Sequence, residues 1–509
     1  MDYTLSQRIL AWFGKELKKP MTLLTHCHSE RSRGMCCSWV KSRSIVVVLA
    51  MLTVPLIASA QWPEQVIYSF QGGTDGAVPV GNVVFDSAGN LFGVTTSGGS
   101  SSCAPVSECG TVYQLTPPAR PGDSWTETVL YIFKGNVFGD GATPVGGLVM
   151  DAAGNLYGTT AYGGTGDCRL LGTLGGCGTV YEMSPPSEPG GEWIETVLYS
   201  FPDATVGYFP SGDLVFDTSG NLYGSTIWGG GEGTNCGNSF YPYCGTVFEL
   251  SPPRTPGQPW AVQTLYRFRG LRTAEGPVGD GASPNGDLAL GNNREIYGTT
   301  VLGGFSCPHN QHYGCGTVFK LEPPNQPGLT WTETVIHRFN PDSIPLQDGT
   351  RPLAGVLIQA DGSLLGTASG GGPAYGGIIF GLAPPGKQFG DWNETIVHAF
   401  DGITDGYDPQ GSLLRYRPDI LCGTTFSGNG DNSSGSAYCL KQSDTNKRLW
   451  QFANIHGFAG VPDGVWPNAG MARGKENNLF GTTSQGGTGT ACTFNCGTVF
   501  EISPPKGFR

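Results

Sequence analysis

The chain has 509 residues and a net charge of −12, which disfavours nucleic acid and anionic membranes as partners because both are negatively charged. Glycine and proline (81 and 37 residues) approach the level typical of disordered proteins. An aromatic content of 11% and glycines at fixed spacings exclude that class. The length allows several domains or one large repeat array.

The N-terminal segment has the pattern of a secretory signal. Lys41 and Arg43 precede a 16-residue apolar run that ends in the small-residue sequence Ala58-Ser59-Ala60. The run is shorter than the roughly 20 residues of a membrane span. We therefore predict a signal peptide over residues 35–60, a mis-set start or extension over 1–34, and a released single domain over 61–509. That domain has a net charge of −17, because residues 1–60 carry eight Lys/Arg and three Asp/Glu.

An internal repeat dominates the rest of the sequence. A segment of the type "NLYGTT" occurs seven times, and each copy contains four short β-type runs. In the second copy these runs are "GGLVMD", "NLYGTT", "GTVYEM" and "WIETVLYSF". The pattern predicts an all-β protein, a seven-bladed β-propeller of four-stranded antiparallel blades. The central glycines of the seven copies are Gly93, Gly158, Gly224, Gly298, Gly366, Gly423 and Gly481.

The two ends of the repeat array complement each other. A tryptophan opens each fourth-strand run, and the first such run, "WPEQVIYSF", precedes every "NLYGTT" copy. The last copy ends after its third run. We therefore expect residues 62–70 to complete the last blade beside 497–502, because an open array would leave exposed strand edges. The seven tryptophans are Trp62, Trp125, Trp193, Trp260, Trp331, Trp392 and Trp450.

The pattern "GGLVMDAAGNLYGTTAYGG…CGTVYEMSPP…WIETVLYSF" resembles the GloVer-type tandem-repeat family, over about residues 62–505. The resemblance implies a secreted protein. It supplies no activity, cofactor or functional residue, because none is assigned to the family. The copies around Gly366 and Gly423 depart from the pattern.

Twelve cysteines follow the predicted cleavage site, and they occur in pairs inside single repeats. Five pairs flank the loop before "GTV", the sixth joins the second and third runs of copy six, and copy five has none. This arrangement predicts disulfides. An alternative is zinc in the loop that contains His309 and His312, but four sister loops have the cysteines without histidine, so we predict no metal site. The pairs are Cys103/Cys109, Cys168/Cys177, Cys236/Cys244, Cys307/Cys315, Cys422/Cys439 and Cys492/Cys496.

A "D-G-x-x-P" motif precedes the first run of six copies. Its carboxylates are turn residues in one interpretation and the rim of a ligand-binding face in another, because they share a ring face with the cysteine loops. Carboxylates beside aromatic rings suit sugars, and carboxylates beside carbonyls suit Ca²⁺. The candidate rim comprises Asp75, Asp140, Asp280, Asp348, Asp405, Asp463, Tyr162, Tyr208, Trp228, Tyr407 and Trp466.

No motif of a known catalytic class is present in the sequence. His337, His398 and His456 replace the tyrosine of "LYSF" and are interpreted as packing residues. The first hypothesis is therefore a secreted, monomeric, non-enzymatic protein that binds carbohydrate or protein on the disulfide-bearing loop face. The alternatives are a glycan hydrolase or lyase that uses rim carboxylates, and a structural surface protein. No cofactor is expected except Ca²⁺.

Overall fold

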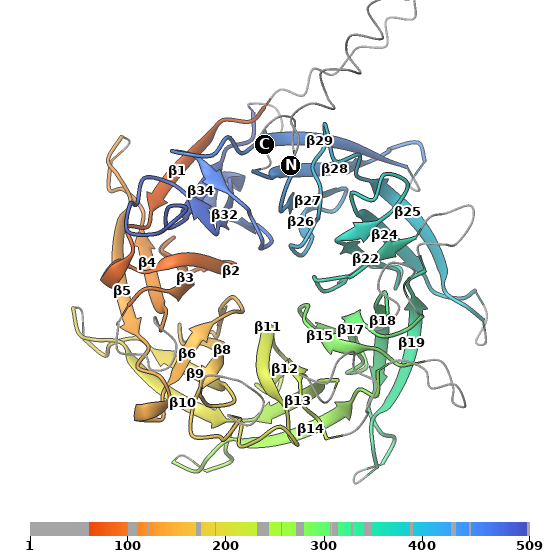
Figure 1. Ribbon diagram of the computed structural model, residues 1–509, viewed down its shortest axis with the longest axis horizontal. Coiled ribbons are helices and arrows are strands. Elements are labelled where there is room, and N and C mark those ends of the chain that lie inside the picture. The colour runs from red at the N-terminus through yellow and green to blue at the C-terminus, as the bar shows by residue number, and fades with distance from the viewer. Residues whose placement is uncertain are drawn as a thin grey trace, which may run out of the picture. The chain divides into compact units, whose positions relative to one another are not determined.

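The computed structural model divides the chain into two units, residues 1–56 and 57–509, and the second is described below. The described residues are 61–99, 109–120, 122–168, 175–188, 190–231, 244–255, 257–270, 279–305, 307, 314–326, 329–340, 348–386, 390–428, 434–446 and 449–505. They form seven antiparallel blades arranged around a central hub (Figure 1), two of which include a short extra two-stranded sheet. The only helices among them are short 3-10 turns, η1 (Gly73–Asp75), η2 (Asn136–Phe138) and η4 (Lys475–Asn477), and none could span a membrane.

Each blade runs from an inner strand at the hub to an outer strand at the rim. Blade 1 is β2 (Ala77–Phe85), β3 (Leu91–Ser97), β4 (Thr111–Thr116) and β5 (Thr126–Ile132). Blade 2 is β6 (Gly141–Pro144) with β7 (Val149–Met150), β8 (Leu156–Gly163), β9 (Thr179–Ser184) and β10 (Ile194–Ser200). Blade 3 is β11 (Tyr208–Phe216), β12 (Leu222–Trp228), β13 (Thr246–Ser251) and β14 (Ala261–Arg267).

The other four blades repeat this order. Blade 4 is β15 (Ala282–Pro284) with β16 (Ala289–Leu290), β17 (Ile296–Leu302), β18 (Thr317–Glu322) and β19 (Thr332–Arg338). Blade 5 is β20 (Gly349–Thr350) with β21 (Leu357–Ile358), β22 (Leu364–Ala368) with β23 (Gly370–Gly371), β24 (Ile378–Ala383) and β25 (Asn393–Ala399). Blade 6 is β26 (Leu414–Arg417), β27 (Ile420–Thr425), β28 (Ser436–Gln442) and β29 (Trp450–Gly457). Blade 7 is β30 (Gly464–Val465) with β31 (Ala472–Arg473), β32 (Leu479–Thr483) with β33 (Gln485–Gly486), β34 (Thr498–Ile502) and β1 (Glu64–Ser69).

The recurrent "YGTT" segment forms the second strand of each blade, and its glycine and its last threonine have structural roles. A Cβ on Gly93 would lie 2.4 Å from the hydroxyl of Tyr113, so glycine makes room for the aromatic ring of the third strand. The last threonine is hydrogen-bonded, hydroxyl to hydroxyl, to the threonine of "GTV", as in Thr160–Thr179 at 2.8 Å. Blade 5 replaces both hydroxyls with the apolar pair Ala368 and Ile378, which keeps the position satisfied. The other pairs are Thr95–Thr111, Thr226–Thr246, Thr300–Thr317, Thr425–Ser436 and Thr483–Thr498.

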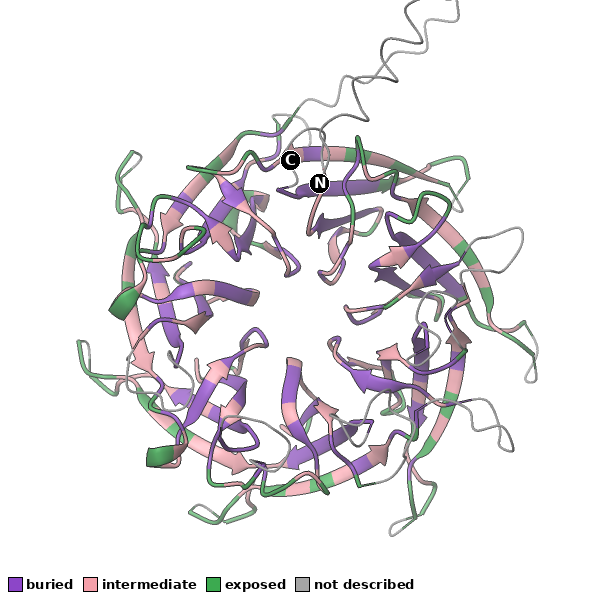
Figure 2. Cartoon of the chain, viewed as in Figure 1, coloured by how far each residue is buried: buried purple, intermediate pink, exposed green. Residues whose placement is uncertain are grey.

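The hydrophobic core lies between the blades. Buried side chains form seven clusters, which combine strands of neighbouring blades. Figure 2 shows this burial on the inner three strands of each blade, whereas the outer strands alternate between exposed and partly buried residues. The ring at the tyrosine position of "YGTT" contacts the tryptophan that opens the fourth strand of the following blade, as in Phe480–Trp125 (5.9 Å) and Phe92–Trp193 (5.7 Å). These contacts bury large aromatic surfaces between blades.

A second contact between neighbouring blades involves the proline of "D-G-x-x-P". It is called the joint below. The residue before the proline has a φ between 56° and 62° in all seven blades. Its N–H donates to the carbonyl just before the glycine of the preceding "GTV" motif, as from Thr143 to Cys109 (2.8 Å). The proline ring covers that glycine, since a Cβ on Gly110 would lie 2.6 Å from Cδ of Pro144. The strained residues are Val78, Thr143, Phe209, Ser283, Arg351, Asp408 and Trp466.

The ring is closed by the N-terminal strand, as predicted. Strand β1 pairs antiparallel with β34, from Glu64 opposite Ile502 to Ser69 opposite Thr498. The junction of blades 7 and 1 contains the same joint as the others, because Val78 donates to the carbonyl of Cys496 at 2.8 Å. The prediction of a closed seven-bladed propeller is confirmed.

Four of the six predicted disulfides are present among the described residues, with Cα–Cα distances of 4.0 to 5.4 Å. They are Cys168–Cys177, Cys307–Cys315, Cys422–Cys439 and Cys492–Cys496. Cys109 and Cys244 are also disulfide-bonded, whereas their expected partners Cys103 and Cys236 lie outside the described residues. Disulfides of this number are typical of proteins in oxidising compartments.

Candidate functional site

The seven inner strands converge on the hub, where glycines allow them to approach closely. A Cβ on Gly146 would lie 2.3 Å from the carbonyl oxygen of Gly212, and one on Gly81 would lie 2.3 Å from the nitrogen of Gly147. A cavity of about 330 Å³ remains between the strands. The residue that follows each hub glycine or alanine differs from blade to blade. In chain order these residues are Asn82, Gly147, Asp213, Asp287, Gly355, Ser412 and Gly470.

Two carboxylates dominate the wall of this cavity. Asp213 accepts hydrogen bonds from the side-chain amide of Asn82 (2.6 Å) and from the N–H of Gly147 (2.5 Å). Asp287 accepts from the N–H of Asp213 (2.8 Å) and from the hydroxyl of Ser412 (2.6 Å). The Asn82–Asp213 pair joins blades 1 and 3, and the Asp287–Ser412 pair joins blades 4 and 6. In both cases the blade between them has a glycine at the equivalent position, which leaves space for the contact. The result is one continuous polar network over blades 1 to 4 and 6.

The electrostatics of the network favour a bound proton. Burial and the negative charge of Asp287 raise the pKa of Asp213 well above its ordinary value. Asp213 is half-buried in the cavity wall, so its charged form is less well solvated than it would be in water. No Lys, Arg or His lines the cavity, so no basic side chain compensates the two carboxylates there. The wall therefore offers both hydrogen-bond donors and acceptors.

The cavity continues toward the ends of the strands that lead into the cysteine loops. Its wall on this side includes Thr96, Phe209 and Ile227, which lie near those ends. Phe209 packs edge-on against Tyr162 (ring centroids 5.2 Å apart) and at 4.9 Å from Trp228. Tyr208 is 5.6 Å from Trp228. Three aromatic residues of the candidate rim, Tyr162, Tyr208 and Trp228, thus lie together beside the hub cavity.

The six aspartates of the candidate rim do not converge on one site. Each lies at its own blade junction and contacts the tyrosine or histidine of the preceding outer strand. The carboxylates also accept backbone N–H groups, as Asp140 does from Lys134 (2.8 Å). Their proposed role in ligand binding remains a prediction. The contacts are Tyr68–Asp75 (2.5 Å), Tyr131–Asp140 (2.8 Å), Tyr266–Asp280 (2.7 Å), His337–Asp348 (2.9 Å), His398–Asp405 (2.8 Å) and His456–Asp463 (3.3 Å).

The other candidate residues lie apart from the hub cavity. Tyr407 is 44% exposed on blade 6, and Trp466 stacks on Phe426 with ring centroids 5.4 Å apart. His309 and His312 lie outside the described residues. The three other histidines, interpreted as packing residues, also contact carboxylates directly, as given above.

The hub residues were missed in the sequence although a signal was present. Copies three and four read "SGDLVF" and "NGDLAL" where copy two reads "VGGLVM". An aspartate therefore replaces a small residue in two consecutive copies. The direction of these side chains depends on the irregular register of the inner strand, such as the shift between Ser211 and Val215, which the repeat alone does not reveal.

Comparisons with solved structures find similarity at the level of the fold. An ulvan lyase from a family of polysaccharide lyases, solved with -[GlcA(1-4)Rha3S]-, has 12% identity and a TM-score of 0.46, over 86% of this chain and 96% of its own. A protein assigned as a 6-phosphogluconolactonase from Bacteroides uniformis has 12% identity and a TM-score of 0.39, over 74% and 84%. A protein assigned as a glucose dehydrogenase from Thermus thermophilus has 13% identity and a TM-score of 0.38, over 87% and 99%.

No curated protein matches the sequence. The Gloeobacter/Verrucomicrobia repeat matches residues 57–240 and 305–509, which is more than half of the chain. The resemblance seen in the sequence is thereby confirmed, and the chain belongs to the Gloeobacter/Verrucomicrobia repeat family.

Proposed function

We propose that the protein is a secreted, non-enzymatic binding protein that holds an uncharged carbohydrate end group in the hub cavity. The observation that carries the proposal is the polar network of Asp213, Asp287, Asn82 and Ser412 beside the aromatic cluster around Phe209. Sugar hydroxyls both donate and accept hydrogen bonds, and the flat C–H faces of a sugar ring pack on aromatic rings. The network lines the cavity, and the aromatic cluster reaches its wall through Phe209.

The size and charge of the cavity narrow the class of ligand. A volume of about 330 Å³ is at the small end of ligand sites, so it suits a terminal sugar residue and not a long chain. Acidic sugars and phosphate esters are disfavoured, because two carboxylates line the wall without a basic side chain. The location in a rigid ring favours binding by a largely preformed site.

Secretion is the second part of the proposal. The apolar run over residues 45–60 has the length and small-residue ending of a signal peptide. The disulfides support an oxidising destination, since thiols stay reduced in the cytosol. Mass spectrometry of the N-terminus after export should find Gln61 as the first residue.

Binding is tested by screening neutral oligosaccharides against the purified chain by isothermal titration calorimetry. Ser412→Ala removes the hydroxyl that donates to Asp287, and Trp228→Ala removes one wall of the aromatic cluster. Each variant should weaken binding about tenfold or more, as expected for the loss of one hydrogen bond to a charged group or one aromatic contact. Tyr407→Ala is the matched control, because it removes an exposed aromatic residue that does not line the cavity.

The same experiment separates the other functions. Release of shortened glycans would identify an enzyme, in which the Asp213–Asp287 pair would act as acid and base. Calcium-dependent binding would identify Ca²⁺ at the same carboxylates. Equal binding by all three variants would contradict the hub as the site, and the absence of binding to any neutral glycan would contradict the proposed ligand class.

A further inference from the structure

Five of the seven blade junctions contain the same group of three side chains. The outer strand of one blade contributes a tyrosine or histidine, the following loop contributes an aspartate, and the outer strand of the next blade contributes a glutamate. The glutamate lies four residues before the tyrosine or histidine of its own strand. The groups are Tyr68/Asp75/Glu127, Tyr131/Asp140/Glu195, Tyr266/Asp280/Glu333, His337/Asp348/Glu394 and His456/Asp463/Glu64.

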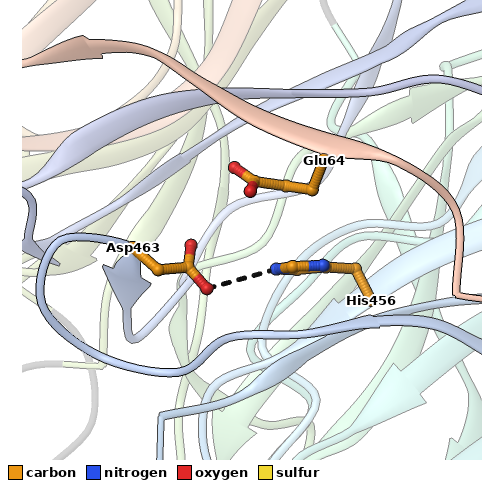
Figure 3. A group of neighbouring side chains, drawn as sticks. All are labelled: Glu64, His456 and Asp463. Atoms are coloured by element: carbon orange, nitrogen blue, oxygen red, sulfur yellow. Dashed lines mark hydrogen bonds and ion pairs between the residues drawn. The ribbon is translucent and has the colours of Figure 1, made fainter.

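The two groups with histidine bring three ligand atoms of different chemistry together. In each, one imidazole nitrogen and two carboxylate oxygens lie within 4.8 Å of one another. Nε2 of His337 lies 2.9 Å from Asp348 and 3.8 Å from Glu394, and Nε2 of His456 lies 3.3 Å from Asp463. Figure 3 shows Glu64 and Asp463 on either side of the space in front of the His456 ring.

The glutamates point to a missing partner. Oε1 of Glu394 and Oε1 of Glu64 are buried and accept no hydrogen bond from any described residue, as is also the case for the glutamates of the three tyrosine junctions. The side chain of Glu394 is only 9% exposed, and its Oε1 is the atom directed at His337. Two carboxylates this close cannot both ionise in a buried position unless a proton or a cation compensates their charge.

The spacing of the ligand atoms fits a tetrahedral transition-metal ion. Bonds of about 2.0–2.1 Å to nitrogen and oxygen imply ligand atoms about 3.3 Å apart. The distances of 2.9, 3.3 and 3.8 Å in the two groups scatter around that value. One imidazole with two carboxylates is a donor set for Zn²⁺, whereas Ca²⁺ and Mg²⁺ prefer oxygen alone. We propose that the 4/5 junction (His337, Asp348, Glu394) and the 6/7 junction (His456, Asp463, Glu64) each bind one Zn²⁺, with a water as fourth ligand.

The other junctions provide internal controls for this assignment. Three have a tyrosine whose neutral hydroxyl donates to the aspartate, so they lack the nitrogen ligand. The third histidine, His398, contacts Asp405 but has Phe452 where the glutamate would be, and the two rings stack at 4.0 Å. Only the junctions with both histidine and glutamate offer the complete donor set among the described residues. A bound ion would link two blades at each site.

The test is zinc binding to the metal-stripped full chain, with ion content measured by mass spectrometry and stability by thermal unfolding. The double variant His337→Tyr/His456→Tyr builds the junction that three other blade pairs already contain, so its fold should be retained. The parent chain should bind two more equivalents of Zn²⁺ than this variant and should show a rise in Tm with zinc that the variant lacks. His398→Tyr should behave like the parent chain.

A second variant and a crystallographic measurement show whether the zinc ions bind at these two junctions and not elsewhere. Glu64→Gln/Glu394→Gln retains both histidines and should also lose the two equivalents. Crystals of the zinc-loaded chain should show anomalous scattering at the zinc edge at both junctions. Equal zinc content and an equal rise in Tm in the parent chain and both double variants would overturn the proposal, as would anomalous peaks confined to other places. Neither outcome depends on whether the hub binds a carbohydrate.

Discussion

The blade junctions and the hub are both contacts between neighbouring blades, but they use the repeat in opposite ways. At the junctions the same residues recur, as with the proline-on-glycine joint and the strained residue before the proline, which are present seven times. At the hub the backbone recurs and the side chain that follows the glycine changes from Asn82 to Gly147 to Asp213. The repeated residues therefore build the contacts between the blades, whereas the residues that differ between copies line the hub cavity.

The difference also bears on how the recurring aspartates are interpreted. The six recurring aspartates looked like a ligand rim because of their number and chemistry. Their contacts with tyrosine or histidine show that each has a local partner at its own junction. Asp213 and Asp287, which occur at this position in two copies alone, line the hub cavity.

The strongest way to break the junctions is to remove the strand that closes the ring. Deletion of residues 61–72 eliminates β1 and with it Trp62, Ile67 and Phe70, which are at most 7% exposed. Truncation of one buried Phe or Trp costs about 3–5 kcal/mol, so the loss should exceed about 5 kcal/mol and expose the edge of β34. Chemical denaturation would measure it.

A hub variant is the natural control for this deletion. Ser412→Ala should leave the unfolding midpoint within about 1 kcal/mol of the parent chain, because it removes one partly exposed hydroxyl. If the deletion unfolded at the same midpoint as the parent chain, the closed ring would not be what stabilises the blades.

The joint between blades is tested by two glycine substitutions. Gly178→Ala places a Cβ 2.4 Å from the carbonyl oxygen of Thr160 and 2.5 Å from Pro210, at a φ of 96°. Gly154→Ala has a similar φ of 88° at a turn, with no atom within 4 Å. Both pay the left-handed penalty of about 1–2 kcal/mol, and only the joint adds overpacking of about 1–3 kcal/mol.

Thermal and urea unfolding of the two glycine variants should therefore differ by about 1–3 kcal/mol. Equal destabilisation would mean that the blades shift apart to accommodate the methyl group. In that case the joint would not constrain the ring.

The repeat made the strands, turns, ring closure and disulfide pairs predictable, because each depends on short segments with a period. The proximity of Glu64 to Asp463 was not predictable in this way, since the two lie near opposite ends of the chain and meet only after the ring closes. The hub network was hidden for the same reason. Asn82 and Asp213 are 131 residues apart and meet only because Gly147 leaves space between them.

Changes in the hydroxyl pair of "YGTT" and "GTV" should have a smaller effect on stability. They distinguish the contribution of the hydrogen bond between the two hydroxyls from that of side-chain packing. Thr160→Ala leaves the buried hydroxyl of Thr179 without its partner and should cost about 1–3 kcal/mol. The double change Thr160→Ala/Thr179→Ile copies the Ala368–Ile378 pair of blade 5 and should recover most of that loss. A double-mutant cycle by urea unfolding measures the coupling. Additive effects would show that the hydroxyls do not depend on each other.

The smallest expected effect is a pH dependence that comes from the tyrosine-containing junctions. Burial and the nearby charge of Asp280 raise the pKa of Glu333 to about 8, and burial with Asp75 raises that of Glu127 to about 7. The folded state therefore holds these protons more tightly than the unfolded state does. Their contribution to stability is complete below about pH 4.5 and is lost as the pH rises to about 8.

Glu333→Gln should remove this contribution to the pH dependence, because the amide is neutral at every pH, as the protonated acid is. Its Tm should exceed that of the parent chain by roughly 2 °C at pH 8.5 and should equal it at pH 5. Asp213 at the hub has a pKa shift of the same sign, so Asp213→Asn in the same background separates the two regions. A pH-independent difference between Glu333→Gln and the parent chain would show that the glutamate is ionised in the folded ring, with Arg338 or Arg269 as its counter-charge.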